Sequence, residues 1–195
     1  EVIEFTAVAN EYCKFIEEAS EAEGIKLLQV LQKLLPLLYM KSLYLPDVES
    51  KLEEDNEKFV REEDWQAIKD TLTYKFGAAN DYVDVNQEEA TTEDLVYGDI
   101  AENLADIYQD IKDFLMAYRL GVLEIMNDAL WECKESFKIY WGQTLVNTIR
   151  AVHYALKEPE KLEEDMPLGR EEQDKSDWFI TRRQSESGNG EGDDV

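Results

Sequence analysis

Five carboxylates recur at helical spacing within one stretch of the sequence, DIAENLADIYQDIKDFL at 99–115. Because a helix turns about 100° per residue, intervals of three and four residues place them in one row along a helix. Oxygen ligands in such a row suit a hard divalent cation, and paired carboxylates can serve acid–base chemistry. The same row is equally typical of the polar boundary of a bundle helix, so both interpretations stay open. The five residues are Asp99, Glu102, Asp106, Asp110 and Asp113.

The chain has one histidine, His153, on an apolar face of the last predicted helix, and Arg150 lies one turn before it. The helices on either side of Gly121 should pack antiparallel, because the break between them is short. That packing would bring Asp106 and Asp110 beside Arg150 and His153, and we expect ion pairs or hydrogen bonds between these groups. A structural network is favoured over catalysis. The alternative is a metal site formed by Glu102, Asp106, Asp110 and His153.

Apolar residues recur at helical spacing through most of the chain, which predicts an all-α fold, a helical bundle of about five to seven helices. We expect at most a short hairpin near 78–98. Pro36 should kink or split the second helix. Gly142 stands inside the last helix beside Trp141, which indicates the close approach of a neighbouring helix. The helices are expected at roughly 2–22, 25–45, 64–76 with Asp64 as the N-cap, from 92 or 99 to 119, and 122–157.

The distribution of apolar residues divides the chain into three regions. The bundle domain takes up residues 1–157, and Pro159 ends its last helix. Residues 158–180 form an acidic C-terminal extension in which Trp178 and Phe179 could dock on the bundle or on a partner. Residues 181–195 are polar and of low complexity, so we expect a disordered acidic tail.

The charge of the chain limits its partners. A net charge of −25 repels phosphate backbones and anionic lipid headgroups, so we expect no nucleic acid and no membrane partner. The longest apolar run, at 24–40, is too short and too polar for a transmembrane helix. Cys13 and Cys133 lie far apart in the sequence, each within a predicted helix. This placement favours buried free thiols, which are typical of a reducing compartment. We expect a cytoplasmic protein.

Three stretches resemble a known bacterial family: WQAIKDTLTYKFG at 65–77, NLADIYQDIKDF at 103–114 and SFKIYWGQTLVNTIRAVHYAL at 136–156. The family is the bacterial domain of unknown function 5063, whose members pair a D-x-A-D-I-Y-x-D-type helix with a later W-G helix. The resemblance covers roughly residues 1–157. It implies an all-helical, cytoplasmic, bacterial protein and no particular activity. The positions carried over from it are Asp106, Tyr108, Asp110, Trp141, Gly142 and His153.

Two classes of function fit these features. The first is a non-catalytic protein-binding adaptor or regulator without a cofactor. The sequence has no glycine-rich phosphate loop, nucleophile elbow or zinc-spaced histidine pair. An acidic surface, in addition, favours binding to basic partners. The alternative is a divalent-metal-dependent enzyme that acts on a phosphorylated small molecule, with Mg²⁺ or Mn²⁺ on the carboxylate row. The aromatic residues of the last helix favour core or interface positions over a ligand pocket; they are Trp131, Tyr140, Trp141 and Tyr154.

The predicted tail can be tested by limited proteolysis. Brief trypsin treatment should cut at Arg182 or Arg183 and leave the bundle intact, because a segment with little apolar surface offers its backbone to the protease. Mass spectrometry of the products, followed by a circular dichroism melt of the core, gives the readout. Resistance to cleavage, or unfolding of the core once the tail is removed, would contradict a disordered tail.

Overall fold

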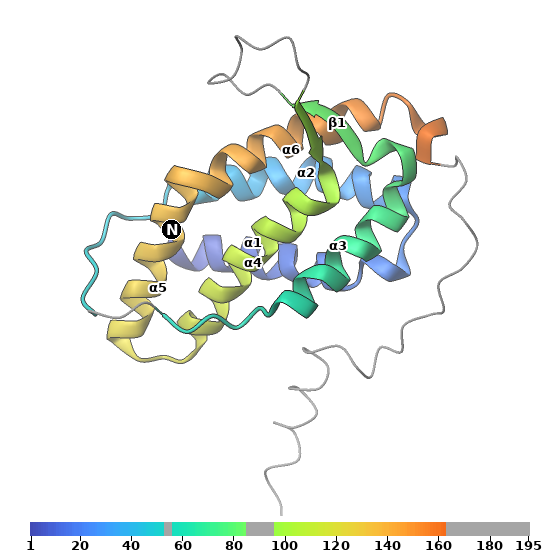
Figure 1. Ribbon diagram of the computed structural model, residues 1–195. Coiled ribbons are helices and arrows are strands. Elements are labelled where there is room, and N and C mark those ends of the chain that lie inside the picture. Colours follow the sequence, from blue (N-terminus) through green and yellow to red (C-terminus); the bar gives the residue numbers. More distant parts are fainter. Residues whose placement is uncertain (53–55, 85–95, 163–195) are drawn as a thin grey trace, which may run out of the picture. The chain divides into compact units, whose positions relative to one another are not determined.

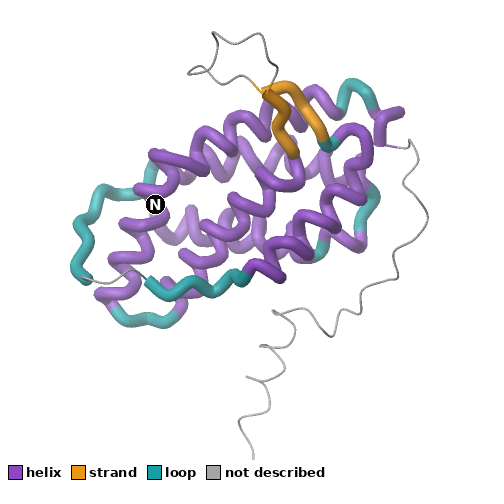
Figure 2. The backbone as a smooth tube through the Cα atoms, viewed as in Figure 1, coloured by secondary structure: helices purple, strands orange, loops and turns teal. Residues whose placement is uncertain are grey.

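Six α-helices make up most of the structure, which is a computed structural model describing residues 1–52, 56–84 and 96–162. The all-α fold expected from the periodicity is confirmed (Figures 1 and 2). Strands β1 (Asp81–Asp84) and β2 (Val96–Asp99) pair antiparallel, so the short hairpin is confirmed as well. The helices are α1 (Val2–Glu17), α2 (Gly24–Leu43), α3 (Glu62–Phe76), α4 (Ile100–Arg119), α5 (Leu123–Ser136) and α6 (Gly142–Ala155).

Helix α4 is the centre of the bundle. It packs against α1, α3, α5 and α6, and α2 packs against α1 and α6. Figure 1 shows α4 passing through the middle of the helices. Burying one large apolar side chain stabilises a fold by about 1.5–3 kcal/mol, so this face supplies much of the core. Its buried side chains include Ile100, Leu104, Ile107, Ile111 and Phe114, which recur at helical spacing along one face.

Local signals set most helix ends. The Asp99 carboxylate accepts from the N–H of Glu102 at 2.8 Å and caps α4. Gly77 ends α3 and Gly121 follows α4, and both take positive φ angles, of 51° and 74°, that favour glycine. Helix α3 begins at Glu62, ahead of the expected cap at Asp64, whose carboxylate instead accepts from the N–H of Arg61 at 3.3 Å. Of the two outcomes expected at Pro36, a kink or a split, the split is wrong, because α2 continues through this residue.

The expected single helix over 122–157 is two α-helices joined by a π-helical turn, Phe137–Trp141. The N–H of Gly142 donates to the carbonyl of Phe137, five residues before it, which is the π-type bond. A Cβ on Gly142 would overlap that carbonyl oxygen and lie 3.0 Å from the Phe137 ring. The widened turn therefore requires glycine here, and the neighbouring helix predicted from the sequence is not the reason.

The described residues all belong to one compact unit, Glu1–Asp165. Most of the predicted extension over 158–180, with Trp178 and Phe179, lies outside the described residues, and so does the predicted tail over 181–195. Across residues 1–52, 56–84 and 96–162, no helix combines the length and apolar character needed to cross a bilayer.

The role of Gly142 can be tested by Gly142→Ala. Crowding a packed site costs about 1–3 kcal/mol, against a gain of up to about 1 kcal/mol from the better helix propensity of alanine. We expect a net loss of unfolding free energy and a lower Tm, by about 2–4 °C per kcal/mol in a chain of this size. Gln143→Ala, at an exposed neighbouring position, is the control and should change stability by less than about 0.5 kcal/mol. Equal stability of both variants would contradict a glycine requirement.

Candidate functional site

The carboxylate row (Asp99, Glu102, Asp106, Asp110 and Asp113) meets a different partner at each position. Asp99 caps its own helix, and Glu102 forms an ion pair with Lys69 of α3. Asp106 accepts from α3 and from the π turn, Asp110 accepts from the end of α5, and Asp113 accepts from the backbone between α2 and α3. The row therefore lies along a contact between α4 and several elements that pack on one side of it.

Asp106 joins two aromatic side chains. The indole N–H of Trp65 donates to its Oδ1 at 2.9 Å, and the hydroxyl of Tyr140 donates to its Oδ2 at 2.5 Å. Burial, together with the bond to the Asp106 carboxylate, raises the pKa of Tyr140 well above its ordinary value. The Lys69 ammonium lies 5.1 Å from the centre of the Trp65 ring. Tyr140 thus stays a protonated donor across the physiological pH range, and Asp106 holds α3 to the π turn.

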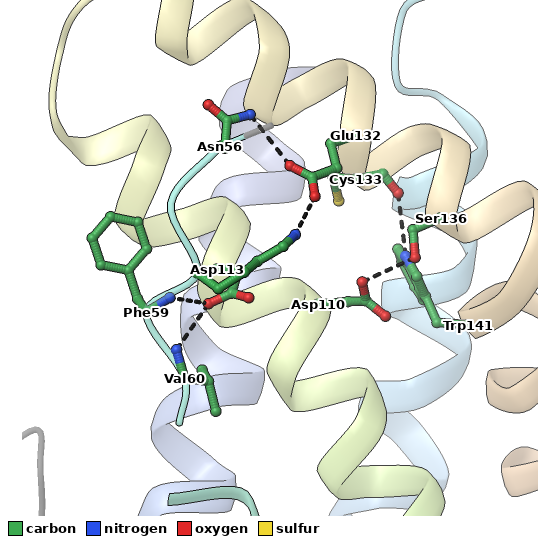
Figure 3. A network of polar contacts seen from close by, with 10 residues as sticks. Asn56, Phe59, Val60, Asp110, Asp113, Glu132, Cys133, Ser136 and Trp141 are labelled. Atoms are coloured by element: carbon green, nitrogen blue, oxygen red, sulfur yellow. Dashed lines mark hydrogen bonds and ion pairs between the residues drawn. The ribbon is translucent and has the colours of Figure 1, made fainter. Parts of the chain in front are cut away.

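Asp110 has a pKa that is shifted toward neutral pH. Its Oδ1 accepts from the hydroxyl of Ser136 at 2.9 Å (Figure 3). Burial raises the pKa of Asp110 to about 6, although the bond from Ser136 and the charge of Lys58 act in the opposite direction. The neighbouring charges of Asp113 and Asp106 raise it further. A carboxyl group with this pKa changes its ionisation close to neutral pH.

Asp113 and Glu132 hold the segment 56–60 against α4 and α5. Asp113 is buried and accepts from the backbone N–H groups of Phe59 at 2.7 Å and Val60 at 3.0 Å (Figure 3). Glu132 forms an ion pair with Lys58. Burial raises the pKa of Asp113, whereas the two backbone hydrogen bonds lower it. Phe59 and Val60 are buried, and Asp113 supplies the acceptor that their backbone N–H groups would otherwise find in water.

A cavity of about 10 Å³ lies between these groups, lined by Lys58, Asp110, Asp113, Glu132 and Cys133 among others. This volume corresponds to about one water molecule, and the polar lining could hold it. The space is too small for a phosphorylated substrate. The cavity lies where segment 56–60, α4 and α5 meet.

A further carboxylate, Asp128 of α5, accepts hydrogen bonds from residues 50–52, which follow α2. It accepts from the N–H groups of Lys51 at 2.8 Å and Leu52 at 2.7 Å, and from the hydroxyl of Ser50 at 3.1 Å. These hydrogen bonds, with one from Asn127, lower the pKa of Asp128 although its burial acts in the opposite direction. Sequence reasoning missed this residue, because one aspartate in a helix of mixed polarity gives no signal of a distant partner.

The predicted pairing of Asp106 and Asp110 with Arg150 and His153 is wrong. Arg150 donates to the carbonyl of Val83 in β1 at 2.9 Å, and the Nδ1 of His153 lies 3.3 Å from the side-chain nitrogen of Gln32 in α2. His153 is exposed, because the buried line of α6 runs through Leu145, Thr148 and Val152 instead.

The other predicted residues lie in separate places. The hydroxyl of Tyr108 donates to Glu17 of α1 at 3.1 Å, and the indole N–H of Trp141 donates to the carbonyl of Cys133 at 3.2 Å. Gly142 serves the π turn. Each of the seven residues of the predicted network therefore has its own separate contact, and only the Asp106 and Asp110 contacts lie along the row.

The structure does not gather the proposed metal ligands Glu102, Asp106, Asp110 and His153. Within the described parts of the chain, no three His, Cys, Asp or Glu side chains converge to hold a metal ion. Both cysteines are buried, and burial raises the pKa of the Cys13 and Cys133 thiols, which disfavours the nucleophilic thiolate. Sequence reasoning did not assign to this site the side chains of neighbouring elements that take part in it. Three of them donate to the row and two form an ion pair beside it: Trp65, Ser136 and Tyr140, and Lys58 with Glu132.

Fold and site together define an all-α bundle in which neighbouring elements bind to a row of carboxylates on a central helix. The chain belongs to the family described as a domain of unknown function (DUF5063), whose sequence model matches residues 1–158, so the predicted membership is confirmed. The chain is similar to protein BF1032 from Bacteroides fragilis, known from a crystal structure, with 38% identity and a TM-score of 0.70. That similarity covers 87% of this chain and 96% of the other. No curated protein matches the chain.

Asp110 predicts a pH dependence of stability. Its pKa of about 6 in the fold exceeds the ordinary value of 3.8, so the folded state holds the proton more tightly than the unfolded chain does. The stabilisation by the protonated form is complete below about pH 4 and is lost as the pH rises through about 6. Asp110→Asn keeps an acceptor for Ser136 without the charge. We expect it to raise the unfolding free energy by about 1–3 kcal/mol at pH 7.5 and to leave it nearly unchanged at pH 4.

Urea unfolding of wild type and variant at both pH values measures this difference. Glu124→Gln is the control, because Glu124 is exposed and has no ion pair among the described residues. Its difference from wild type should be the same at both pH values. A variant Asp110→Asn that is less stable than wild type at pH 7.5 would show that the ionised form contributes to the fold.

Proposed function

We propose that the chain is a non-catalytic protein-binding adaptor or regulator. One observation carries the proposal: four of the five carboxylates of the row accept from other parts of the fold, and the fifth, Asp99, caps α4. Asp106 has two donors, Asp113 has two backbone donors, and Glu102 has an ammonium partner. Binding a metal or a substrate there would require breaking contacts that hold α3, α5 and segment 56–60 to α4.

The surface supports binding to a protein. Several large apolar side chains are between 61% and 83% exposed, and they come from well-formed parts of the bundle. A net charge of −25 steers basic partners toward the molecule and repels phosphate backbones and anionic membranes. The strongly exposed side chains are Ile3, Tyr44, Tyr97, Leu123 and Ile139.

A bacterial cytoplasm is the proposed location. The similarity to a Bacteroides fragilis protein supports a bacterial source. The two buried free thiols, Cys13 and Cys133, support a reducing compartment.

Thermal melting with divalent metals separates this proposal from the metal-dependent enzyme. An ion at ten thousand times its Kd stabilises a protein by about 5 kcal/mol through mass action. We expect the Tm to be unchanged by Mg²⁺ or Mn²⁺ when ionic strength is matched with NaCl. Asp106→Asn and Asp110→Asn should show the same lack of response. A rise of several degrees in wild type that is lost in both variants would favour the enzyme and overturn the adaptor.

A further inference from the structure

The side chains of the π turn differ sharply in burial. Phe137 and Trp141 are buried, with ring centres 4.6 Å apart, whereas Ile139 is 83% and Tyr140 48% exposed. Isoleucine is among the residues most often buried in proteins, so its display in the middle of a helical run is informative. Single π turns inside helices occur frequently at functional sites, because the extra residue changes which side chains face outward.

The neighbouring aromatic side chains are held in fixed positions. Asp106 accepts from Trp65 at 2.9 Å and from Tyr140 at 2.5 Å, so one carboxylate orients a half-buried indole and an exposed phenol. Trp and Tyr side chains contribute strongly to protein interfaces. A ring that is already oriented loses less conformational entropy when a partner binds, which improves affinity.

The charge beside these rings is negative. Asp106 has only uncharged donors among the described residues, the indole of Trp65 and the hydroxyl of Tyr140. Lys69 is nearby, but it forms an ion pair with Glu102. Asp110 follows one turn along α4 and adds another carboxylate. A cationic ligand would therefore gain both from the carboxylate charge and from the electron-rich face of Tyr140.

We propose that Trp65, Asp106, Ile139 and Tyr140, which we call the π-turn surface, bind a basic amphipathic segment of a partner protein. An arginine or lysine side chain of that segment stacks on Tyr140 close to Asp106, and an apolar side chain covers Ile139. This inference rests on the proposed protein-binding function and specifies its site and partner chemistry. A second copy of the chain fits less well, because two molecules with a net charge of −25 each repel one another.

Fluorescence anisotropy with a defined probe tests the surface. The probe is a fluorescein-labelled helical peptide of arginine and leucine, and a peptide of the same charge with serine in place of leucine is its control. We expect the full chain to bind the arginine–leucine peptide at least about tenfold more tightly than its control, because only that peptide can cover Ile139. Equal affinity for the two peptides, or no binding to either, would overturn the proposed partner chemistry.

Variants locate the binding. Ile139→Ser with Tyr140→Ala should weaken binding of the arginine–leucine peptide about tenfold, and Asp106→Asn should weaken it and reduce its dependence on salt. The matched control is Tyr97→Ala with Leu123→Ser, since these side chains are 68% and 69% exposed elsewhere, and it should bind as wild type does. Circular dichroism melts check the fold of each variant, and Ile139→Ser alone serves if the double variant is unstable.

The outcomes separate the site from the function. Equal peptide binding by wild type and all variants would overturn the π-turn surface and leave a protein-binding function intact. A concentration-dependent dimer that Ile139→Ser abolishes, seen by light scattering, would assign the surface to a second copy and overturn the proposed partner. A metal-dependent melting shift that is lost in Asp106→Asn and Asp110→Asn overturns the function itself, whatever the peptide does.

Discussion

A carboxylate that is partly buried beside a central helix requires hydrogen-bond donors, and the packing around α4 depends on which elements supply them. Moving a charge out of water without a partner costs several kcal/mol, so each element that covers the row has to supply hydrogen-bond donors. Helix α3 supplies Trp65 and Lys69, α5 supplies Ser136, and segment 56–60 supplies two backbone N–H groups. The row therefore specifies which neighbouring element packs at each level of α4, a selectivity that apolar packing on the adjoining face of α4 lacks.

The row is graded in burial, and its chemistry follows that gradient. Asp113 is buried and has two backbone donors, a set that water cannot easily replace. Asp110 has one hydroxyl donor, and burial raises its pKa to about 6, so its ionisation changes close to neutral pH. Asp106 is half-buried and lies between aromatic groups that reach the surface. Structural use is therefore strongest at Asp113, whereas at Asp106 the row is in contact with side chains that reach the surface.

The periodicity predicted the fold well because each helix carries its own signal: the buried line of α4, the cap at Asp99 and the glycines at 77 and 121 are local features. The partners of the row were predicted wrongly because they depend on register. Counted from Gly121, Asp110 lies 11 residues before it and Ser136 lies 15 residues after it, whereas Arg150 and His153 lie far beyond that level. The position of segment 56–60 could not be predicted, since the acceptors that hold it, Asp113 and Glu132, are distant in sequence.

The π turn connects the fold to the proposed surface. One residue fewer in that turn would rotate α6 relative to α5 by about 100°, the angle of a single helical residue. Either Phe137 or Trp141 would then leave the core, or Tyr140 would move away from Asp106. The glycine at 142 permits the wide turn, the buried rings keep it in place, and the carboxylate of Asp106 fixes the outward phenol. Exposure of Ile139 is thus a consequence of the same geometry that completes the core, and a partner that covers Ile139 would bind to a surface that is already formed.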